Sequence, residues 1–487
     1  MTGSGITMTP DKRNGFKDMD LAPVLMAIIC GFLAAFIVVA KPILAPAVVA
    51  GFLVLVFSAR YAEIPLAFFV FSFAIPAQKT LAGLPLNMAD GMIVLWGAAW
   101  PLLMISRGRD IKIPFIIWAA LPLLIAATLS LFVAVNPGGA LKQVIRLVEW
   151  FVILPVLMMS LRPDKAFWER VSLLFLVVPS FFALDGVVEY LNHGNSITKM
   201  LHIPVPIPDE HKSQIRHTFD VSGRAGSAFG GAQGLAMYLA VMMSVVISVI
   251  LFPARPVFRK LGIAALLLCA AGMFFTKSRG GLLGTLVMLT VLILTRAPKL
   301  GLTIIITGIL AVGGGVFFLL LVYGWDGTVA GLIPGRPEAV LDRLIIWTRA
   351  IKVFTDHPLF GVGFGGFHDE VYRTGGIALN VGLGYESLHC HNTYLEVLTG
   401  TGLVGFLSYL TFLAACMTKL VSLWVNRKGL PSDGFILAAI AAQGAYMMFG
   451  MVDMLFLQNM HFMLLTILTL GFMAGQREPE PVKETTP

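Results

Sequence analysis

Charged residues are scarce in this chain. Of its 487 residues only 13% are charged, whereas 57% are hydrophobic. A soluble domain carries about 25% charged residues, which it needs to cover its surface. The scarcity excludes an ordinary soluble fold and predicts an all-α integral membrane protein whose architecture follows from hydropathy.

Cysteine is also rare, and its placement argues against a disulfide framework. Cys30, Cys269 and Cys416 lie within apolar runs and are expected to act as small hydrophobic residues. Cys390 is the only cysteine in a polar loop, where it has no obvious partner. No disulfide is therefore predicted.

Three further absences narrow the class of function. Gly361, Gly363, Gly365 and Gly366 resemble a phosphate loop, but no Lys-Ser or Lys-Thr pair follows and no strand precedes, so a nucleotide site is not predicted. The formal net charge of +8 is typical of cytoplasmic loops that face anionic headgroups and does not imply a nucleic-acid partner. No internal repeat is visible, which argues against an inverted-repeat transporter.

Long apolar runs fill most of the chain. A transmembrane helix needs roughly 20 mostly apolar residues, and by that measure about 12–14 spans are predicted. The first run follows a basic segment and leads into further spans, so we expect it to be retained rather than cleaved as a signal. The candidates lie near 21–40, 43–59, 64–77, 90–106, 114–135, 141–161, 168–190, 226–252, 261–276, 280–295, 300–322, 400–424, 434–452 and 456–475.

Basic residues alternate between loops and predict the orientation. If the amino terminus is cytoplasmic, the cytoplasmic loops hold most of the Lys and Arg, which is the positive-inside pattern. These loops contain Arg60; Arg107, Arg109 and Lys112; Arg162, Lys165 and Arg170; Arg255, Arg259 and Lys260; Arg296 and Lys299; Arg427 and Lys428.

The same alternation divides the chain into five parts. They are a cytoplasmic tail over 1–20, a first part of the bundle over 21–322 with an external loop at 192–224, a large external loop over 323–391, a last part of the bundle over 392–475, and a Glu/Pro-rich tail over 476–487 that is expected to be disordered.

An amphipathic helix is predicted inside the large external loop. Pro337 and the pair His357-Pro358 bracket it, and it is expected to lie against the membrane surface or the bundle. Its apolar positions follow helical spacing and are Val340, Leu344, Trp347, Ile351 and Phe354.

Two arginines stand at external ends of spans, where positive charge is disfavoured. Arg279 lies beside Lys277 in a very short break between two apolar runs. Charge there is costly unless it is paired or hydrated, so we expect Arg279 to face a water-filled cavity or an anion, with a snorkelling side chain as the alternative. Arg224 opens a span rich in small residues, which leave room for a ligand, with a juxtamembrane anchor as the alternative.

His391 stands where the large external loop meets the next span. Guanidinium groups offer forked donors to phosphate oxygens, and an imidazole accepts a proton near neutral pH. Together these groups predict glycosyl transfer from a lipid-diphosphate donor: the base deprotonates a hydroxyl while Arg224 and Arg279 stabilise the departing diphosphate. Arg343 is a further candidate for the phosphate or the sugar.

A metal site is the competing hypothesis for this histidine. His389 and His391 are two residues apart, and in an extended segment such residues share a face, so both imidazoles have the spacing to bind zinc. His357 or His368 would supply a further ligand. Glu396 would orient an imidazole or, as we prefer, cap the following helix.

Several motifs together resemble one known family. His391-Asn392, followed after nine residues by Gly402-Leu403-Val404-Gly405, resembles the His-[Asn/Ser/Gln]-x9-Gly-x-x-Gly signature of bacterial O-antigen ligases. The resemblance covers about 220–410. Two segments are similar to one that O-antigen ligases share with O-antigen and exopolysaccharide polymerases: Arg343-Leu344-Ile345-Ile346-Trp347 and His357-Pro358-Leu359-Phe360-Gly361-Val362-Gly363-Phe364-Gly365. Two further motifs resemble the arginine-bearing segments of the family: Ser278-Arg279-Gly280-Gly281, and Arg224-Ala225-Gly226 with Phe229.

The resemblance implies a polytopic, GT-C-like glycosyltransferase of the bacterial inner membrane with its site facing the periplasm. Members of the family move a glycan from undecaprenyl diphosphate to a hydroxyl with inversion, and the resemblance implies no metal and no cofactor. It assigns the base to His391 and the diphosphate to Arg224 and Arg279. The expected substrate-binding residues are Arg343, Asn392, Tyr394, Glu396 and Lys277.

The sequence does not determine the identity of the acceptor. The expected partners are a lipid-linked glycan donor and a glycan or lipid A-core acceptor, and the amino-terminal half carries no feature that distinguishes an O-antigen ligase from a Wzy-type polysaccharide polymerase. An anion transporter is the alternative outside the class, although a transporter should place its charges near the bilayer midplane. The sequence does not specify an oligomeric state.

Overall fold

The computed structural model describes residues 63–72, 78–81, 84–105, 113–161, 163–200, 223–229, 231–308, 337–376, 389–453, 455 and 460–476. The expected spans at 21–40 and 43–59 and both terminal tails lie outside these residues, apart from Gln476. The chain divides into two units, one comprising 1–65 with 94–111 and the other 66–93 with 112–487. The second unit carries every contact discussed below.

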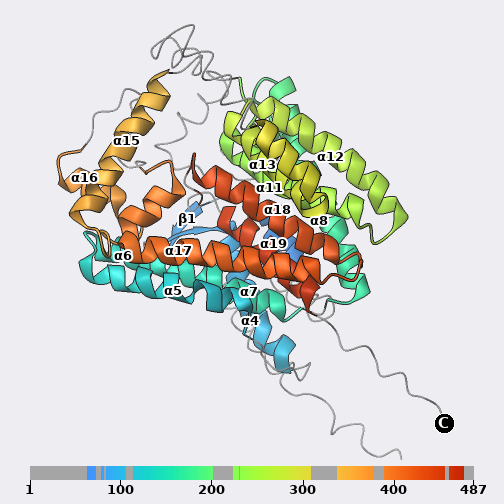
Figure 1. Cartoon of the computed structure of the whole chain (residues 1–487), viewed down its shortest axis with the longest axis horizontal. Helices are drawn as coiled ribbons and strands as arrows, with labels where there is room; N and C mark the ends of the chain where they lie inside the picture. The colour runs from blue at the N-terminus through green and yellow to red at the C-terminus, as the bar shows by residue number, and fades with distance from the viewer. Residues whose placement is uncertain are drawn as a thin grey trace, which may run out of the picture. The chain divides into compact units, whose positions relative to one another are not determined.

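Helices dominate the described part of the chain, as predicted (Figure 1). Seven of its helices are long and apolar enough to cross a membrane, and each matches an expected span. They are α5 (Phe115–Leu129, extended by η2, Ser130–Val133), α8 (Lys165–Leu191), α11 (Ala232–Leu251), α12 (Pro256–Thr276), α13 (Arg279–Arg296), α17 (Thr393–Val425) and α18 (Asp433–Gly450).

Shorter apolar elements match further expected spans. Helices Pro298–Gly308 and α19 (Met460–Gly475) are both apolar, and α4 (Met88–Ile105) fits the span expected at 90–106. The span expected at 64–77 begins with α3 (Glu63–Ser72). A hairpin of β1 (Gln78–Leu81) and β2 (Leu84–Asn87), in which Gln78 pairs with Asn87, lies between α3 and α4 and was not predicted.

The span expected at 141–161 is an interrupted helix. It consists of α6 (Pro137–Val148), a π-helical turn (Glu149–Ile153) and α7 (Leu154–Met159). Pro155 lies in the first turn of α7. Because proline has no amide hydrogen and crowds the preceding turn, the backbone widens before it.

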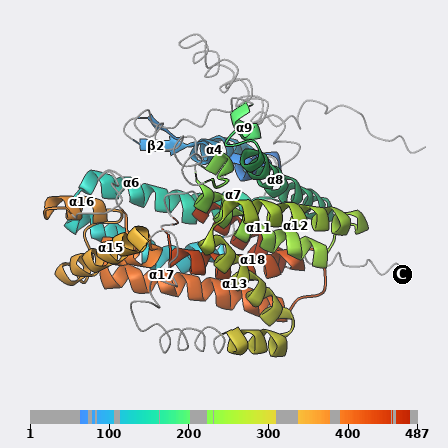
Figure 2. The same ribbon diagram turned by 90° about the horizontal axis from the view of Figure 1, so that it is seen from above.

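Helices α11 and α18 form the centre of this unit. In both, 83% of the apolar window is buried, against 33% in α12 and 22% in α13. Figure 2 shows α8, α11 and α12 side by side, and α11 also packs on α13 and α18. Small residues allow the close approach: a Cβ at Gly272 of α12 would lie 3.1 Å from the Ala183 backbone of α8.

Helix α17 bends at Gly402, which takes φ +63°. A Cβ at this position would lie 2.3 Å from the backbone of Leu359, so only glycine fits. The segment 358–362 follows the bend through hydrogen bonds from Leu403 N to Pro358 O (2.8 Å) and from Val362 N to Thr399 O (3.0 Å). The two glycine-rich motifs that carry the family resemblance thus pack on one another.

The large loop contains α15 (Pro337–Asp356) and α16 (Phe367–Arg373). The expected amphipathic helix is present. Of its predicted stripe, Trp347 packs against the core of the loop, whereas Leu344 and Ile351 are 51% and 53% exposed. Apolar residues lie on more than one face of α15. The face with Ile346, Ala350 and Val353 is buried in the hydrophobic core of the loop. The core consists of Ile346, Ala350, Val353, Val362, Phe367, Val371 and Cys390.

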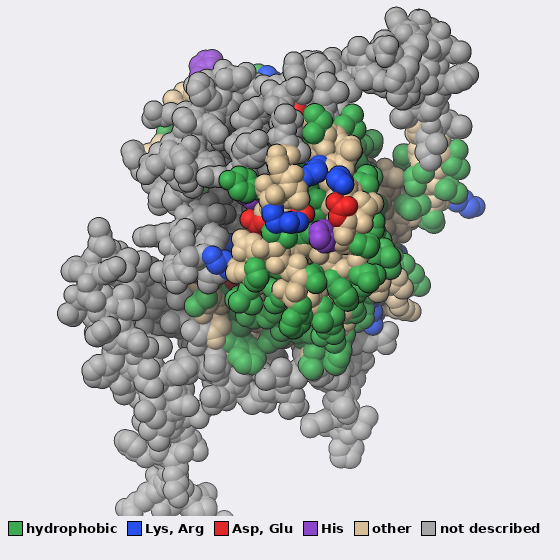
Figure 3. Space-filling model, turned by 90° about the vertical axis from the view of Figure 1, so that its left-hand side faces the viewer, with side chains coloured by type: hydrophobic (Ala, Val, Ile, Leu, Met, Phe, Trp, Pro, Cys, Tyr) green, Lys and Arg blue, Asp and Glu red, His purple; other side chains and the backbone are tan. Residues whose placement is uncertain are grey.

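The surface of α15 and α16 carries mixed charge. On the side that these helices occupy in Figure 1, basic, acidic and histidine side chains gather among apolar ones (Figure 3). Arg373 Nε pairs with Glu370 Oε2 at 2.8 Å, and Arg349 Nη2 donates to Thr374 O at 3.1 Å. Arg349 therefore links α15 to the residue that directly follows α16, whereas the Arg373–Glu370 pair lies within α16.

Candidate active site

His391 lies in a tight turn that leads into α17. Its φ of +46° falls in the left-handed region, which costs free energy for a residue with a Cβ. The next residue, Asn392, caps the helix: its Oδ1 accepts from Tyr394 N (2.9 Å) and Leu395 N (3.1 Å). The cap fixes the backbone from which the imidazole projects.

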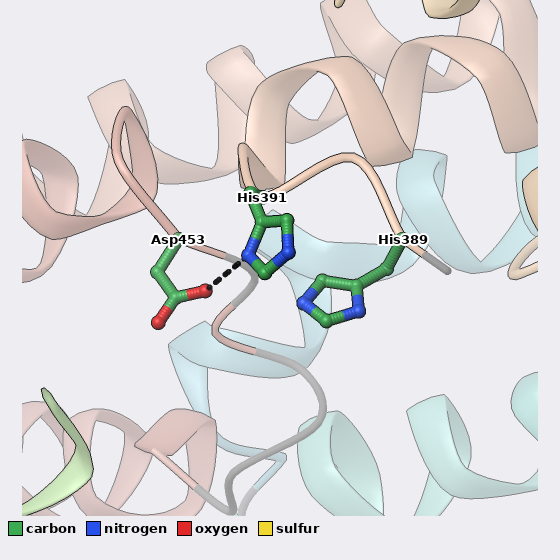
Figure 4. A group of neighbouring side chains, drawn as sticks. All are labelled: His389, His391 and Asp453. Atoms are coloured by element: carbon green, nitrogen blue, oxygen red, sulfur yellow. Dashed lines mark hydrogen bonds and ion pairs between the residues drawn. The ribbon is translucent and has the colours of Figure 1, made fainter. Parts of the chain in front are cut away.

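The imidazole of His391 faces the carboxylate of Asp453, which follows α18 (Figure 4). His391 Nδ1 and Asp453 Oδ1 lie 3.4 Å apart, and the side chains are 24% and 7% exposed. The two residues are 62 positions apart, and nothing in the local sequence indicates that they pair. Asp453 is the main site residue that the sequence did not identify.

Three hydrogen bonds hold the two chain segments in this position. Asn392 Nδ2 donates to Met451 O (3.1 Å), Thr393 Oγ1 donates to Asp453 O (2.9 Å), and Leu455 N donates to Thr393 Oγ1 (3.0 Å). The start of α17 and the end of α18 therefore form one framework around His391 and Asp453.

The turn is also held from the loop side. Glu396 is buried and its Oε2 accepts from Cys390 N (3.0 Å), while Trp347 Nε1 donates to Cys390 O (3.0 Å). Glu396 therefore stabilises the helix start, and Asp453 rather than Glu396 faces the imidazole. Burial, with a contribution from Glu396, raises the pKa of the Cys390 thiol well above its ordinary value.

A basic turn forms between α12 and α13. Ala225 N donates to Phe275 O (3.1 Å) and Arg224 Nε donates to Thr276 O (2.9 Å), so the segment before α11 lies against the end of α12. The turn continues through Lys277, in the left-handed conformation, and Ser278, which caps α13 by accepting from Gly281 N at 3.1 Å. It thereby brings Arg224 close to the backbone that carries Lys277 and Arg279. Lys277 and Arg279 are exposed and Arg224 is half-buried.

Two buried carboxylates fix the segment that carries Arg224. Glu189 Oε2 accepts from Gly226 N (2.7 Å) and Ser227 N (2.6 Å), and its Oε1 pairs with Lys199 Nζ (2.6 Å). Asp185 accepts from Thr198 N (2.8 Å) and from the hydroxyl of Ser227 (2.5 Å). Both acids belong to the span α8, and their hydrogen bonds hold the neighbouring chain segments in place.

The basic turn and the His391 turn border the same stretch of chain. A Cβ at Gly280, the residue after Arg279, would lie 3.4 Å from Cγ2 of Val452. Val452 directly precedes Asp453, the partner of His391. The backbone of the basic turn and the imidazole of His391 therefore both lie beside the segment that follows α18.

The other expected site residues occupy the rim of this region. Tyr394 donates its hydroxyl to Met447 O (2.8 Å), which ties α17 to α18. Arg343 is half-buried and precedes Trp347 by one helical turn, so both lie on the same face of α15. Since Trp347 binds the carbonyl of Cys390, Arg343 is on the face of α15 that is directed at the His391 turn.

His389, His391 and Asp453 also have the donor set of a metal site. Their ligand atoms all lie within 4.8 Å of one another, and the two imidazole centroids are 4.0 Å apart. Three protein ligands with an open position are typical of catalytic zinc. The two histidines expected as further ligands face other carboxylates. His357 Nε2 lies 3.6 Å from Glu370 Oε1, and His368 Nδ1 lies 3.8 Å from Asp369 Oδ1.

Comparison with known proteins identifies the domain that contains most of these residues. Residues 264–410 match the model of the O-antigen ligase family, and the matched range includes the basic turn, α15 and the His391 turn. Arg224 and Asp453 lie outside it. A search of curated proteins finds no match. Residues 264–410, which hold the His391 signature and the basic turn, are thus similar to the O-antigen ligase family.

Proposed function

We propose that this protein transfers a glycan from undecaprenyl diphosphate to an acceptor hydroxyl at the periplasmic face of the inner membrane. The family match supports a membrane enzyme of the O-antigen ligase type. The observation that carries the finer proposal is that two features border the same end of α18. One is an imidazole with a buried carboxylate partner, and the other is a turn that carries Lys277 and Arg279 and to which Arg224 is bonded.

His391 is the proposed base. If Nδ1 carries its hydrogen toward Asp453, Nε2 has a free lone pair for the proton of the acceptor hydroxyl. The acceptor oxygen then forms a bond to the anomeric carbon of the donor sugar, and the bond from that carbon to the diphosphate oxygen breaks. The electron pair leaves with the diphosphate, and Asp453 stabilises the imidazolium that remains.

Arg224, Lys277 and Arg279 are the proposed diphosphate-binding residues. Negative charge grows on the diphosphate as its bond to the sugar breaks, so cations fixed beside it stabilise the transition state more than the ground state. The hydrogen bond from Arg224 to the end of α12 and the cap of α13 hold these groups in place before the substrate arrives. The reaction needs no metal in this scheme.

The location of the proposed site at the ends of helices suits a lipid-linked donor. The polyprenyl tail would lie between spans in the bilayer, while the sugar and the diphosphate reach the aqueous interface. The same geometry disfavours an anion transporter, because the cations of the site lie at the ends of α12 and α13 rather than at mid-helix.

The experiment is transfer by the full chain in nanodiscs, with an undecaprenyl-diphosphate-linked glycan as donor. His391→Ala should lower the rate by about 10²–10⁴-fold, the usual contribution of a positioned base. His193→Ala is the matched control, since His193 is an exposed histidine with positive φ in the turn after α8. Wild-type rates in His391→Ala, with the protein folded, would remove the proposal.

A polymerase would use the same chemistry with a second carrier-linked glycan as acceptor. The motifs that include His357-Pro358 and Gly361 resemble a segment that ligases and polymerases share. The assay separates the two: a ligase forms product only when a lipid A-core acceptor is supplied, whereas a polymerase lengthens the donor glycan without it.

A further inference from the structure

A cavity of about 570 Å³ lies at the end of the bundle opposite to His391. It is bordered by the start of α8, the turn between α11 and α12, the turn between α17 and α18, and the end of α19. All of these segments are on the side that the basic loops predict to be cytoplasmic. The volume is within the range of about 300–1,000 Å³ that is typical of small-molecule sites.

The rim of this cavity is cationic. Lys165, Arg427 and Lys428 line it, and all three are exposed. The guanidinium of Arg427 is held in place, 3.8 Å from the centre of the Trp424 ring and bonded through Nη1 to Trp424 O at 2.8 Å. Three cations on one rim favour an anionic ligand.

The one carboxylate in the lining is used by the backbone. Asp433 is buried, and its Oδ2 accepts from Gly429 N (2.6 Å) and Leu430 N (2.8 Å). These bonds shape the turn that directly follows Arg427 and Lys428. Asp433 therefore holds the turn in place, and its position does not make the rim neutral.

The wall of the cavity is apolar. It includes Trp168, Leu423, Ile436 and Met473. A small inorganic anion would leave this wall in contact with water. A molecule with an anionic head and an apolar body would instead cover both surfaces.

We propose that this cavity binds an anionic phospholipid, with its phosphate at the cationic rim and its glycerol and upper acyl segments against the apolar wall. Basic pockets between the cytoplasmic ends of transmembrane helices are suited to such headgroups. The proposal does not rest on glycan transfer, because the cavity shares no residue with the His391 site.

The test is native mass spectrometry of the full chain in detergent, titrated with phosphatidylglycerol or with zwitterionic phosphatidylcholine. Phosphatidylglycerol should bind as one saturable adduct and phosphatidylcholine should not. Lys428→Gln should weaken binding about fivefold, the factor that corresponds to about 1 kcal/mol per basic residue near an anionic lipid. Lys260→Gln is the control, since Lys260 is exposed on the same side but does not line the cavity.

A second variant tests the cavity without changing charge. Ala254→Trp fills the space beside the α11–α12 turn and should abolish the adduct, while a thermal melt reports whether the protein is folded. Inorganic phosphate in excess should not displace the lipid. Displacement would show a free-anion site instead, and equal lipid binding by the wild type and all variants would overturn the proposal.

Discussion

The two ends of the helix bundle both carry basic residues, but they hold them differently. At the His391 end, Arg224, Lys277 and Arg279 meet at a short, capped turn beside buried carboxylates. At the other end, Lys165, Arg427 and Lys428 are exposed at helix termini around a cavity. Positive charge at the end that the basic loops predict to be cytoplasmic is expected from membrane insertion alone. Positive charge at the opposite end has no such origin, and it supports the proposed diphosphate site there.

Matched arginine variants test the difference between the two ends of the bundle most strongly. Arg279→Lys keeps the charge but loses the forked donors, so we expect glycan transfer to fall by about 10²–10³-fold, as when one donor to a developing anion is removed. Arg259→Lys, at the other end, should retain the wild-type rate, because Arg259 is exposed and donates to Ile250 O at 3.3 Å. Equal rates in the two variants would contradict the difference between the ends.

Removing the charge of the buried Asp453 carboxylate is expected to lower the rate of glycan transfer by a smaller factor. Asp453→Asn keeps the shape but removes the charge that faces His391, and we expect kcat to fall by about 10–100-fold with KM little changed, as for residues that orient a functional imidazole. Asp164→Asn is the control at the other end, since asparagine caps a helix as well as aspartate. A rise in KM without a change in kcat would show that Asp453 acts on binding instead.

Metal chelation distinguishes the two interpretations of the histidine pair. If His391 is the base, treatment with EDTA should leave glycan transfer unchanged. Added zinc should inhibit, because His389, His391 and Asp453 offer it three ligands and the lone pair of the base would be occupied. Loss of activity on chelation, restored by zinc, would instead make these residues ligands of a catalytic metal.

The smallest effect concerns Cys390, which reports whether the loop beside His391 is packed. Because burial raises its pKa, the thiol should stay protonated at about pH 8.5, where a free cysteine is half ionised. Alkylation followed by peptide mass spectrometry should therefore modify Cys390 slowly in the folded protein and rapidly after denaturation. Fast modification of the folded protein would show that this loop opens.

Sequence patterns that depend on local chemistry predicted much of this structure. Apolar length predicted spans such as α8 and α12, because the bilayer sets a helix length. The short break at Lys277 and Arg279 was identified because adjacent cations do not belong between apolar runs. Asn392, directly before a helix, was placed at the site, and the structure shows that it caps α17.

Features that depend on tertiary contact were not predicted. Asp453 is distant in sequence from His391, and an acid at a span end gives no sign of which group it faces. The face that α15 buries depends on the loop core, because its apolar residues cover more than one stripe. The hairpin of β1 and β2 lacks the Asn-Gly or Asp-Gly turn that would have indicated it.

The most direct test of the central claim is a double-mutant cycle between His391 and Arg279, with single-turnover glycan transfer measured in the wild type, His391→Ala, Arg279→Lys and the double variant. If both residues act on one transition state, the double variant should be about as slow as the slower single variant, because residues that act as a unit are strongly non-additive. Independent, multiplicative losses, or no loss in either single variant, would contradict one shared site.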